Sequence, residues 1–218
     1  MQDSTTREKI LKKIRQALIH KTNARFPNID WDKNVYSTTN ESLEEQFARS
    51  FSKIGGQFVF CETELEFLEH LVTLAQEKGW KMIHCREEKI TKLMDQVEFP
   101  YLKNSVDYPE GVVAVTSCEA LVARLGSVII SSKLGSGRQL FVVPTTHIIL
   151  AYTSQIVPEL KDALQKLKSK YGEQLPSMIA SLTGPSRTAD IEKTLVTPAH
   201  GPRDIMVFLV DDQTPPEN

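Results

Sequence analysis

The sequence has no long apolar run, no secretory leader pattern and no dominant charge. Its most apolar stretch, residues 141–152, contains Pro144 and is shorter than the roughly 18 residues that a membrane-spanning helix needs. The 26 basic and 28 acidic residues give a net charge of −2, which argues against a non-specific nucleic-acid binder. We therefore expect a cytoplasmic protein with no integral membrane segment and no nucleic-acid partner.

Cysteine is scarce, and the common cofactor motifs are missing. The three cysteines, Cys61, Cys85 and Cys118, lie far apart in the sequence, which argues against a disulfide framework, a zinc site or an iron–sulfur motif. No histidine pair has the spacing of metal ligands, and there is no Walker loop, Gly-x-Gly-x-x-Gly or Gly-x-Ser-x-Gly motif. The sequence predicts buried, reduced thiols and neither a metal nor a cofactor bound by this chain.

An amphipathic helix is expected ahead of the main domain. Ile10, Ile14 and Leu18 recur at helical spacing within residues 7–21, and basic residues occupy the other faces. The pattern leaves open whether this helix packs on the domain, on a second copy in a homo-oligomer, or on a membrane surface. We expect residues 1–40 to form this helix and an extended connection, 41–212 to form one α/β domain, and 213–218 to be a disordered tail.

Strand and helix patterns alternate along the domain. The expected strands cover residues 57–61, 81–85, 111–116, 127–132, 139–143, 147–152, 178–182 and 205–210. The expected helices cover residues 42–54, 64–78, 87–96, 157–171 and 188–194, with a helical turn at 118–123. This order predicts a mixed, mainly parallel sheet with helices on both faces, and a locally antiparallel part around residues 127–152.

The most informative stretch is the glycine-proline turn Gly184-Pro185-Ser186-Arg187, which leads into the expected helix at Thr188. A strand, a tight turn and a helix start together direct backbone N–H groups and the positive helix end at one point, which is the geometry of an anion site. Ser186 and Thr188 can cap the helix or contact a ligand oxygen, and Arg187 suits a carboxylate or phosphate. The alternative is a capped helix start in which Arg187 pairs with Asp190 or Glu192.

A second turn, residues 199–204, repeats the arrangement with Gly201, Pro202 and Arg203. Every arginine after residue 120 lies within three residues of a glycine: Arg124, Arg138, Arg187 and Arg203. We therefore expect these arginines in loops at the ends of the sheet, with Arg187 and Arg203 on one anionic ligand. The loop containing Gly135, Gly137 and Arg138 joins two expected strands, and we interpret it as a flexible loop that closes over a site.

Catalysis has only two weak candidates. His200 lies in the second turn and is the best placed proton carrier, and Asp190 is the other candidate. A lone loop histidine is more often a hydrogen-bonding turn residue, so the sequence leaves open whether the chain is an enzyme.

Two stretches carry a family resemblance: Gly184-Pro185-Ser186-Arg187-Thr188-Ala189-Asp190-Ile191-Glu192, and then His200-Gly201-Pro202-Arg203. Together they resemble the lactate-utilisation (LUD) domain family, C-type branch. The resemblance implies a fold similar to the sugar-phosphate isomerase and CoA-transferase superfold (NagB/RpiA/CoA-transferase-like). It also implies an accessory role in oxidising L-lactate to pyruvate, beside a partner subunit, an oxidoreductase that carries the iron–sulfur clusters.

One position departs from the family pattern. Many members carry Ala-Glu-Thr-Gly where this chain has Ala123-Arg124-Leu125-Gly126. The lost carboxylate weakens a CoA-transferase-like covalent mechanism, and Arg124 would add positive charge if its loop faces a ligand pocket. Three interpretations remain open: an accessory component that binds a small anion, a stand-alone transferase-like or isomerase-like enzyme, and a ligand-sensing or scaffold module.

Overall fold

The computed structural model describes residues 5–19, 30, 40–103, 111–185, 188–189, 195–196 and 201–213. The chain divides into two units, residues 1–40 and 41–218. In the first unit, helix α1 (Thr6–Ile19) begins where Thr5 and Glu8 bond each other's backbone N–H groups. None of the residues of α1 is buried, so its apolar stripe is exposed.

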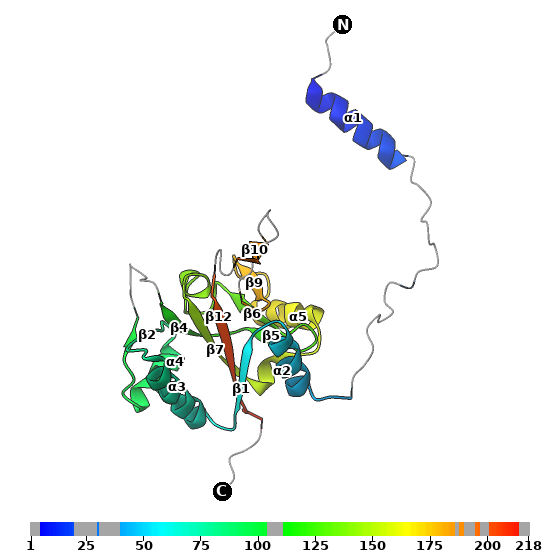
Figure 1. Cartoon of the computed structure of the whole chain (residues 1–218). Helices are drawn as coiled ribbons and strands as arrows, with labels where there is room; N and C mark the ends of the chain where they lie inside the picture. Colours follow the sequence, from blue (N-terminus) through cyan, green and yellow to red (C-terminus); the bar gives the residue numbers. More distant parts are fainter. Residues whose placement is uncertain are drawn as a thin grey trace. The chain divides into compact units, whose positions relative to one another are not determined.

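A fully parallel six-stranded sheet forms the centre of the second unit (Figure 1). Its strands, in spatial order, are β1 (Gln57–Cys61), β12 (Asp204–Val210), β7 (Thr146–Tyr152), β4 (Val113–Ser117), β2 (Ile83–His84) and β3 (Tyr101–Leu102). Successive residues of β7 face opposite sides, since Ile148 belongs to one apolar cluster and Ile149 to another. Both faces are therefore covered, which explains the continuous apolar runs in the sequence.

Helices α3 (Glu64–Lys78) and α4 (Glu88–Gln96) cover one face of the parallel sheet (Figure 1). Phe67 of α3 meets Phe208 of β12 edge to face, with 5.3 Å between the ring centroids. Helix α3 ends at Gly79, whose φ of 69° is the left-handed conformation that glycine adopts without steric cost.

Helix α2 (Leu43–Lys53) and a second, four-stranded sheet cover the other face. The strands of this sheet, in spatial order, are β8 (Ile156–Val157), β5 (Ala120–Val122), β6 (Ser127–Ser131) and β9 (Ile179–Leu182). Strands β5, β6 and β9 pair antiparallel, and β8 pairs with β5 in parallel. Helix α5 (Leu160–Tyr171) covers the outer face of this sheet, because its Ala163 and Leu167 pack against β5 and β6.

The predicted class is confirmed: the domain is mixed α/β, its main sheet is parallel, and helices lie on both faces of that sheet. The predicted Ser42 capping box is also present, since Ser42 and Glu45 bond each other's backbone N–H groups at the start of α2. The strand at residues 57–61 and the helix at 64–78 have the predicted bounds.

The predicted helical turn at residues 118–123 is wrong, because this segment contains strand β5. Ala120 pairs with Ile129 of β6, and all three β5 residues are buried between two apolar clusters. A short run that is apolar on every side does not distinguish a buried strand from a helical turn.

The predicted strand at residues 139–143 is also wrong. Residues Gln139–Phe141 form a 3-10 turn, η1, which buries Leu140 and Phe141, and Pro144 follows shortly after it. The predicted antiparallel part exists, but it is the separate four-stranded sheet. The strand at 147–152 belongs instead to the parallel sheet as β7. A second 3-10 turn, η2 (Thr153–Gln155), follows β7 directly.

The predicted helix at residues 188–194 is contradicted at its start, and residues 190–194 lie outside the described residues. Strand β10 (Thr188–Ala189) pairs antiparallel with β11 (Leu195–Val196), with Thr188 opposite Val196. Thr188 and Ala189 are therefore paired as a strand and do not open a helix. The argument for an anion site at a positive helix end does not apply at Gly184.

The described part of the chain contains no helix that is long and apolar enough to cross a bilayer. Within the same residues, no three His, Cys, Asp or Glu side chains gather as metal ligands would. The three cysteines are free and buried, and burial raises the pKa of Cys61 and of Cys85 to about 12. These thiols are structural and weakly nucleophilic.

Candidate functional site

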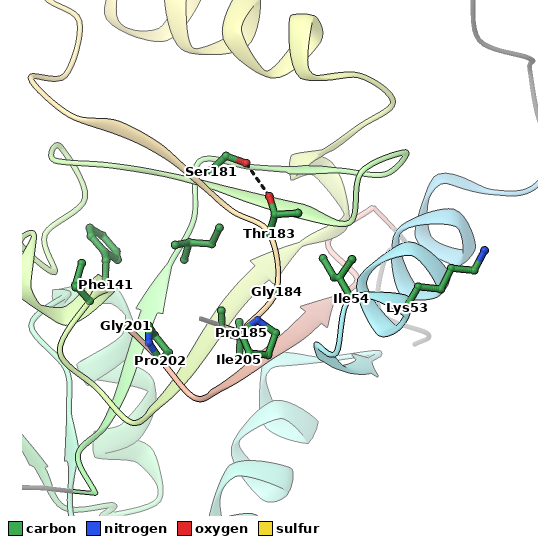
Figure 2. A pocket seen from close by; sticks show the side chains of 12 residues that line it. Lys53, Ile54, Phe141, Ser181, Thr183, Gly184, Pro185, Gly201, Pro202 and Ile205 are labelled. Carbon is green, nitrogen blue, oxygen red and sulfur yellow. Dashed lines mark hydrogen bonds between the residues drawn. The ribbon is translucent and has the colours of Figure 1, made fainter. Parts of the chain in front are cut away.

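A cavity of about 640 Å³ lies between the turn after β9 and the turn before β12 (Figure 2). This volume is within the range of small-molecule sites, roughly 300 to 1,000 Å³. Its lining comes from the end of α2, η1, the end of β9 and the two turns: Lys53, Ile54, Phe141, Val142, Ser181, Leu182, Thr183, Gly184, Pro185, Gly201, Pro202 and Ile205. Both predicted glycine-proline turns thus line one cavity.

Gly184 is required by the close approach of two backbone segments. Its φ is 79°, and a Cβ at this position would lie 2.6 Å from the carbonyl oxygen of Ile54. Any other residue would strain the backbone and push the turn away from the end of α2. The glycine therefore sets the width of the cavity between α2 and the turn.

The polar groups of the cavity are mainly hydroxyls. The Thr183 hydroxyl bonds the Ser127 hydroxyl at 2.9 Å and the Ser181 hydroxyl at 3.3 Å. Figure 2 shows the Lys53 side chain directed away from the centre of the cavity. Among the lining residues, Ile54, Phe141 and other apolar side chains form the walls, so the cavity combines an apolar wall with a hydroxyl pair.

A buried histidine lies beside the cavity wall. His147 pairs in register with the lining residue Ile205, and its ring centroid is 6.0 Å from that of Phe141. Its Nε2 bonds the Thr116 hydroxyl at 2.8 Å, whereas its Nδ1 has no hydrogen-bond partner among the described residues. Burial lowers the pKa of His147 to about 3, so the ring is neutral at pH 7.

The other predicted site residues are placed as follows. Arg203 is exposed, and its backbone N–H donates to the carbonyl of Thr145 at 2.8 Å. Arg138 donates to the Ser177 hydroxyl at 2.7 Å and is not among the residues that line the cavity.

Among the remaining predicted site residues, Thr188 lies in β10. Ser186, Arg187, Asp190 and His200 lie outside the described residues, so the predicted convergence of Arg187 and Arg203 stays a prediction.

The cavity lies at the amino end of the parallel sheet. Ile54 precedes β1, and Gly201 and Pro202 precede β12. In open parallel sheets the usual ligand crevice lies at the opposite, carboxyl edge. The expectation that the glycine-flanked arginine loops would occupy that usual edge therefore does not hold for the Gly201 turn.

Arg124 contributes no positive charge to the cavity. Its Nε donates to both carboxylate oxygens of Glu159, at 2.7 and 2.8 Å, and both side chains are largely buried. Arg124 joins the β5–β6 turn to the start of α5 and does not line the cavity. The acidic residue of the family pattern is thus replaced by one half of a structural ion pair.

The loop around Gly137 is held in place rather than free. The Ser136 side chain is fully buried, and its hydroxyl donates to the carboxylate of Glu87. The Arg138 guanidinium holds the far side of the loop at Ser177. These contacts argue against a freely flexible loop, and its closing over a site stays a prediction.

Comparison with known proteins identifies part of the chain. Residues 111–210 match the family described as LUD domain. The matched residues make up just under half of the chain. The match begins just before β4 and includes both glycine-proline turns, the second sheet and the last strand.

Several proteins named "Lactate utilization protein C" are similar to this chain. One from Bacillus licheniformis is 38% identical over 103 residues, which are 46% of this chain and 43% of that protein. One from Geobacillus sp. (strain WCH70) is 28% identical over 199 residues, covering 90% of this chain and 79% of that protein. One from Macrococcus caseolyticus is 24% identical over 182 residues, covering 83% and 73%. In the match with the highest identity of these three, the aligned residues cover less than half of the relative's length.

A solved structure shares the fold. The crystal structure of a duf162 family protein from Deinococcus radiodurans superposes with a TM-score of 0.59 at 18% sequence identity. The superposition covers 77% of this chain and 96% of that one. It therefore supports the overall α/β fold described above.

Sequence reasoning missed a buried carboxylate, Glu119, within residues 111–210. Glu119 accepts hydrogen bonds from Ser131 (2.5 Å), Tyr171 (2.7 Å) and Lys170 (2.8 Å). Burial would raise the pKa of Glu119, but these hydrogen bonds outweigh burial and lower it. The network joins β6 to the end of α5, and no short-range sequence pattern connects residues so far apart.

Proposed function

We propose that this chain is an accessory component of lactate utilisation, in the oxidation of L-lactate to pyruvate, and that it binds a small anionic ligand in the cavity between the two glycine-proline turns. The observation that supports the pathway is the similarity to proteins named Lactate utilization protein C, at up to 38% identity. The similarity to the Geobacillus protein extends over 90% of this chain.

The cavity offers groups suited to such a ligand. The Ser181 and Thr183 hydroxyls can donate to a carboxylate or phosphate oxygen, and the apolar wall at Ile54 and Phe141 can contact carbon atoms. A cavity of about 640 Å³ is much larger than a three-carbon acid. Its size therefore favours a phosphorylated or otherwise larger anion over lactate or pyruvate alone.

We assign electron transfer to a partner. The described residues do not suit an iron–sulfur cluster, because Cys61, Cys85 and Cys118 are separately buried and burial disfavours their thiolate forms. The partner in this proposal is a cytoplasmic oxidoreductase subunit that carries the clusters. This chain would then bind ligand or stabilise the assembly.

A pair of neighbouring substitutions tests the cavity. Val142 lines it and is 54% exposed, whereas Val143 is 45% exposed and is not among the lining residues. We expect Val142→Trp to fill the cavity and weaken ligand binding about tenfold or more, and Val143→Trp to leave binding unchanged. Isothermal titration of the full chain with L-lactate, pyruvate and pyridoxal phosphate provides the measurement.

Equal binding by the two tryptophan variants would place the ligand outside this cavity. Failure of the wild-type chain to bind any of the three probes would contradict the anion-binding part of the proposal. The lactate-utilisation part would then rest on growth experiments alone.

A further inference from the structure

The order in which the chain adds strands to the parallel sheet reverses between β2 and β4. A second cluster of polar groups lies at this point. From β2 the chain passes through α4 to β3 on one side, whereas from β4 it continues to β7 on the other. Strands β2 and β4 are neighbours, with His84 opposite Ala114. In open parallel sheets, ligands bind in the crevice outside the carboxyl ends of two such strands.

Three hydrogen-bond donors converge at these carboxyl ends. The backbone N–H of Ser117 donates to Oε1 of Glu87 at 2.8 Å, and the Ser117 hydroxyl donates to Oε2 of the same carboxylate. The hydroxyl of the fully buried Ser136 also donates to Oε1. These donors come from the end of β4 and from the loop after β6, so two separate segments form one cradle around a carboxylate.

A cation lies beside the cradle. The Arg86 side chain donates through Nε to the carbonyl of Lys103 at 3.1 Å, which fixes its direction. Its Nη1 lies 3.1 Å from where a Cβ on Gly137 would be, so the guanidinium packs against the loop that contains Ser136. An arginine fixed in this way favours negative charge in the adjacent cradle.

We propose that this cradle is a second ligand site, which binds the carboxylate group of a small organic acid, and that the Glu87 side chain occupies it as a tethered carboxylate. The cradle consists only of donors, and it already holds the group that such a ligand would present. Glu87 and Ser117 are partly exposed, so a carboxylate from solvent can reach them. A tethered competitor lowers the apparent affinity for a free ligand by the fraction of time that it fills the site.

This inference is independent of the proposed function. The two sites lie at opposite edges of the parallel sheet, since the cavity is at the amino ends of β1 and β12 and the cradle is at the carboxyl ends of β2 and β4. Either site can fail its test while the other passes.

The experiment removes the tethered carboxylate and supplies a free one. In Glu87→Ala, amide hydrogen exchange of residues 134–138 should speed up, because Ser136 loses its partner. Acetate or pyruvate should restore the protection, and inorganic phosphate should restore it less because its oxygens are tetrahedral. The apparent Kd for pyruvate should be about tenfold lower than in the wild type.

Matched variants isolate the cradle. Glu88→Ala removes a neighbouring exposed carboxylate that pairs with Lys92, so it makes the same charge change without touching the cradle. Glu88→Ala should leave loop exchange unchanged. In the Glu87→Ala background, Ser117→Ala should abolish the restoration and Val142→Trp should not.

Three results would overturn the proposal. If no carboxylate restores protection in Glu87→Ala, then Glu87 is only a structural clasp for the loop. If restoration survives Ser117→Ala or disappears with Val142→Trp, then the acid binds elsewhere. Should Glu87→Ala fail to fold, refolding it in the presence of acetate or pyruvate provides the same test, and failure of these acids to restore folding contradicts the proposal equally.

Discussion

Gly126→Ala is expected to destabilise the domain by about 4 kcal/mol or more, which is exceptional for so small a change. Gly126 lies in the turn between β5 and β6 with φ of 61°, a conformation that costs an alanine roughly 1 to 2 kcal/mol. In addition, the new Cβ would lie 2.4 Å from the backbone nitrogen of Phe51 in α2. Because this neighbour is helix backbone, it cannot rotate away.

Gly79→Ala is the matched control. Gly79 also has a left-handed φ, 69°, but a Cβ there would meet nothing within 4 Å. Gly79→Ala should therefore lower the free energy of unfolding only by the cost of the left-handed backbone conformation, about 1 to 2 kcal/mol. Urea unfolding of the wild type and both variants gives the comparison, and equal costs at the two positions would show that α2 does not pack on this turn as described.

The second large effect is a loss of stability below pH 6.5 caused by His147. Burial lowers the pKa of His147 from 6.5 to about 3 in the folded chain. Below pH 6.5 the unfolded chain therefore binds a proton that the folded chain does not. The stability contributed by the neutral ring is complete above pH 6.5 and decreases as the pH falls, by up to about 1.4 kcal/mol per pH unit.

His147→Gln should remove this pH dependence. The glutamine amide can still reach the Thr116 hydroxyl, which His147 bonds through Nε2, but it does not titrate between pH 4 and pH 8. His84, whose pKa burial and then Arg86 also lower, is present in both proteins, so the difference between their slopes reports His147. Parallel curves of unfolding free energy from pH 7 to pH 5 would contradict a buried neutral His147.

Local signals predicted the long helices correctly. The Ser42 and Glu45 capping box marks the start of α2, and Gly79 marks the end of α3, because caps are satisfied by residues close in sequence. The order of strands and helices also gave the parallel sheet, since alternation of this kind requires crossovers.

Tertiary packing decided the elements that sequence reasoning got wrong. β5 is buried on both faces, so its side chains show no alternation, and η1 buries Phe141 in a single turn just ahead of Pro144. The segment at Thr188 pairs with Val196 as a strand, although Gly184 and Pro185 alone are equally compatible with a helix start. Local propensity does not reveal such pairings.

The same distinction between local sequence signals and tertiary packing applies to the two candidate sites. The sequence pointed to Gly184 and Gly201, and both line one cavity. The Glu87 cradle was missed, because Ser117 and Ser136 lie 30 and 49 residues away from Glu87 in the chain. Only the strand order brings them to one edge, and strand order does not follow from the residues of any one segment.

Growth on L-lactate as the sole carbon source tests the central claim most directly. A strain that lacks this gene should fail to grow on L-lactate, should grow normally on pyruvate, and should recover on L-lactate when the wild-type chain is restored. Normal growth of the deletion strain on L-lactate would contradict a role of this protein in lactate utilisation.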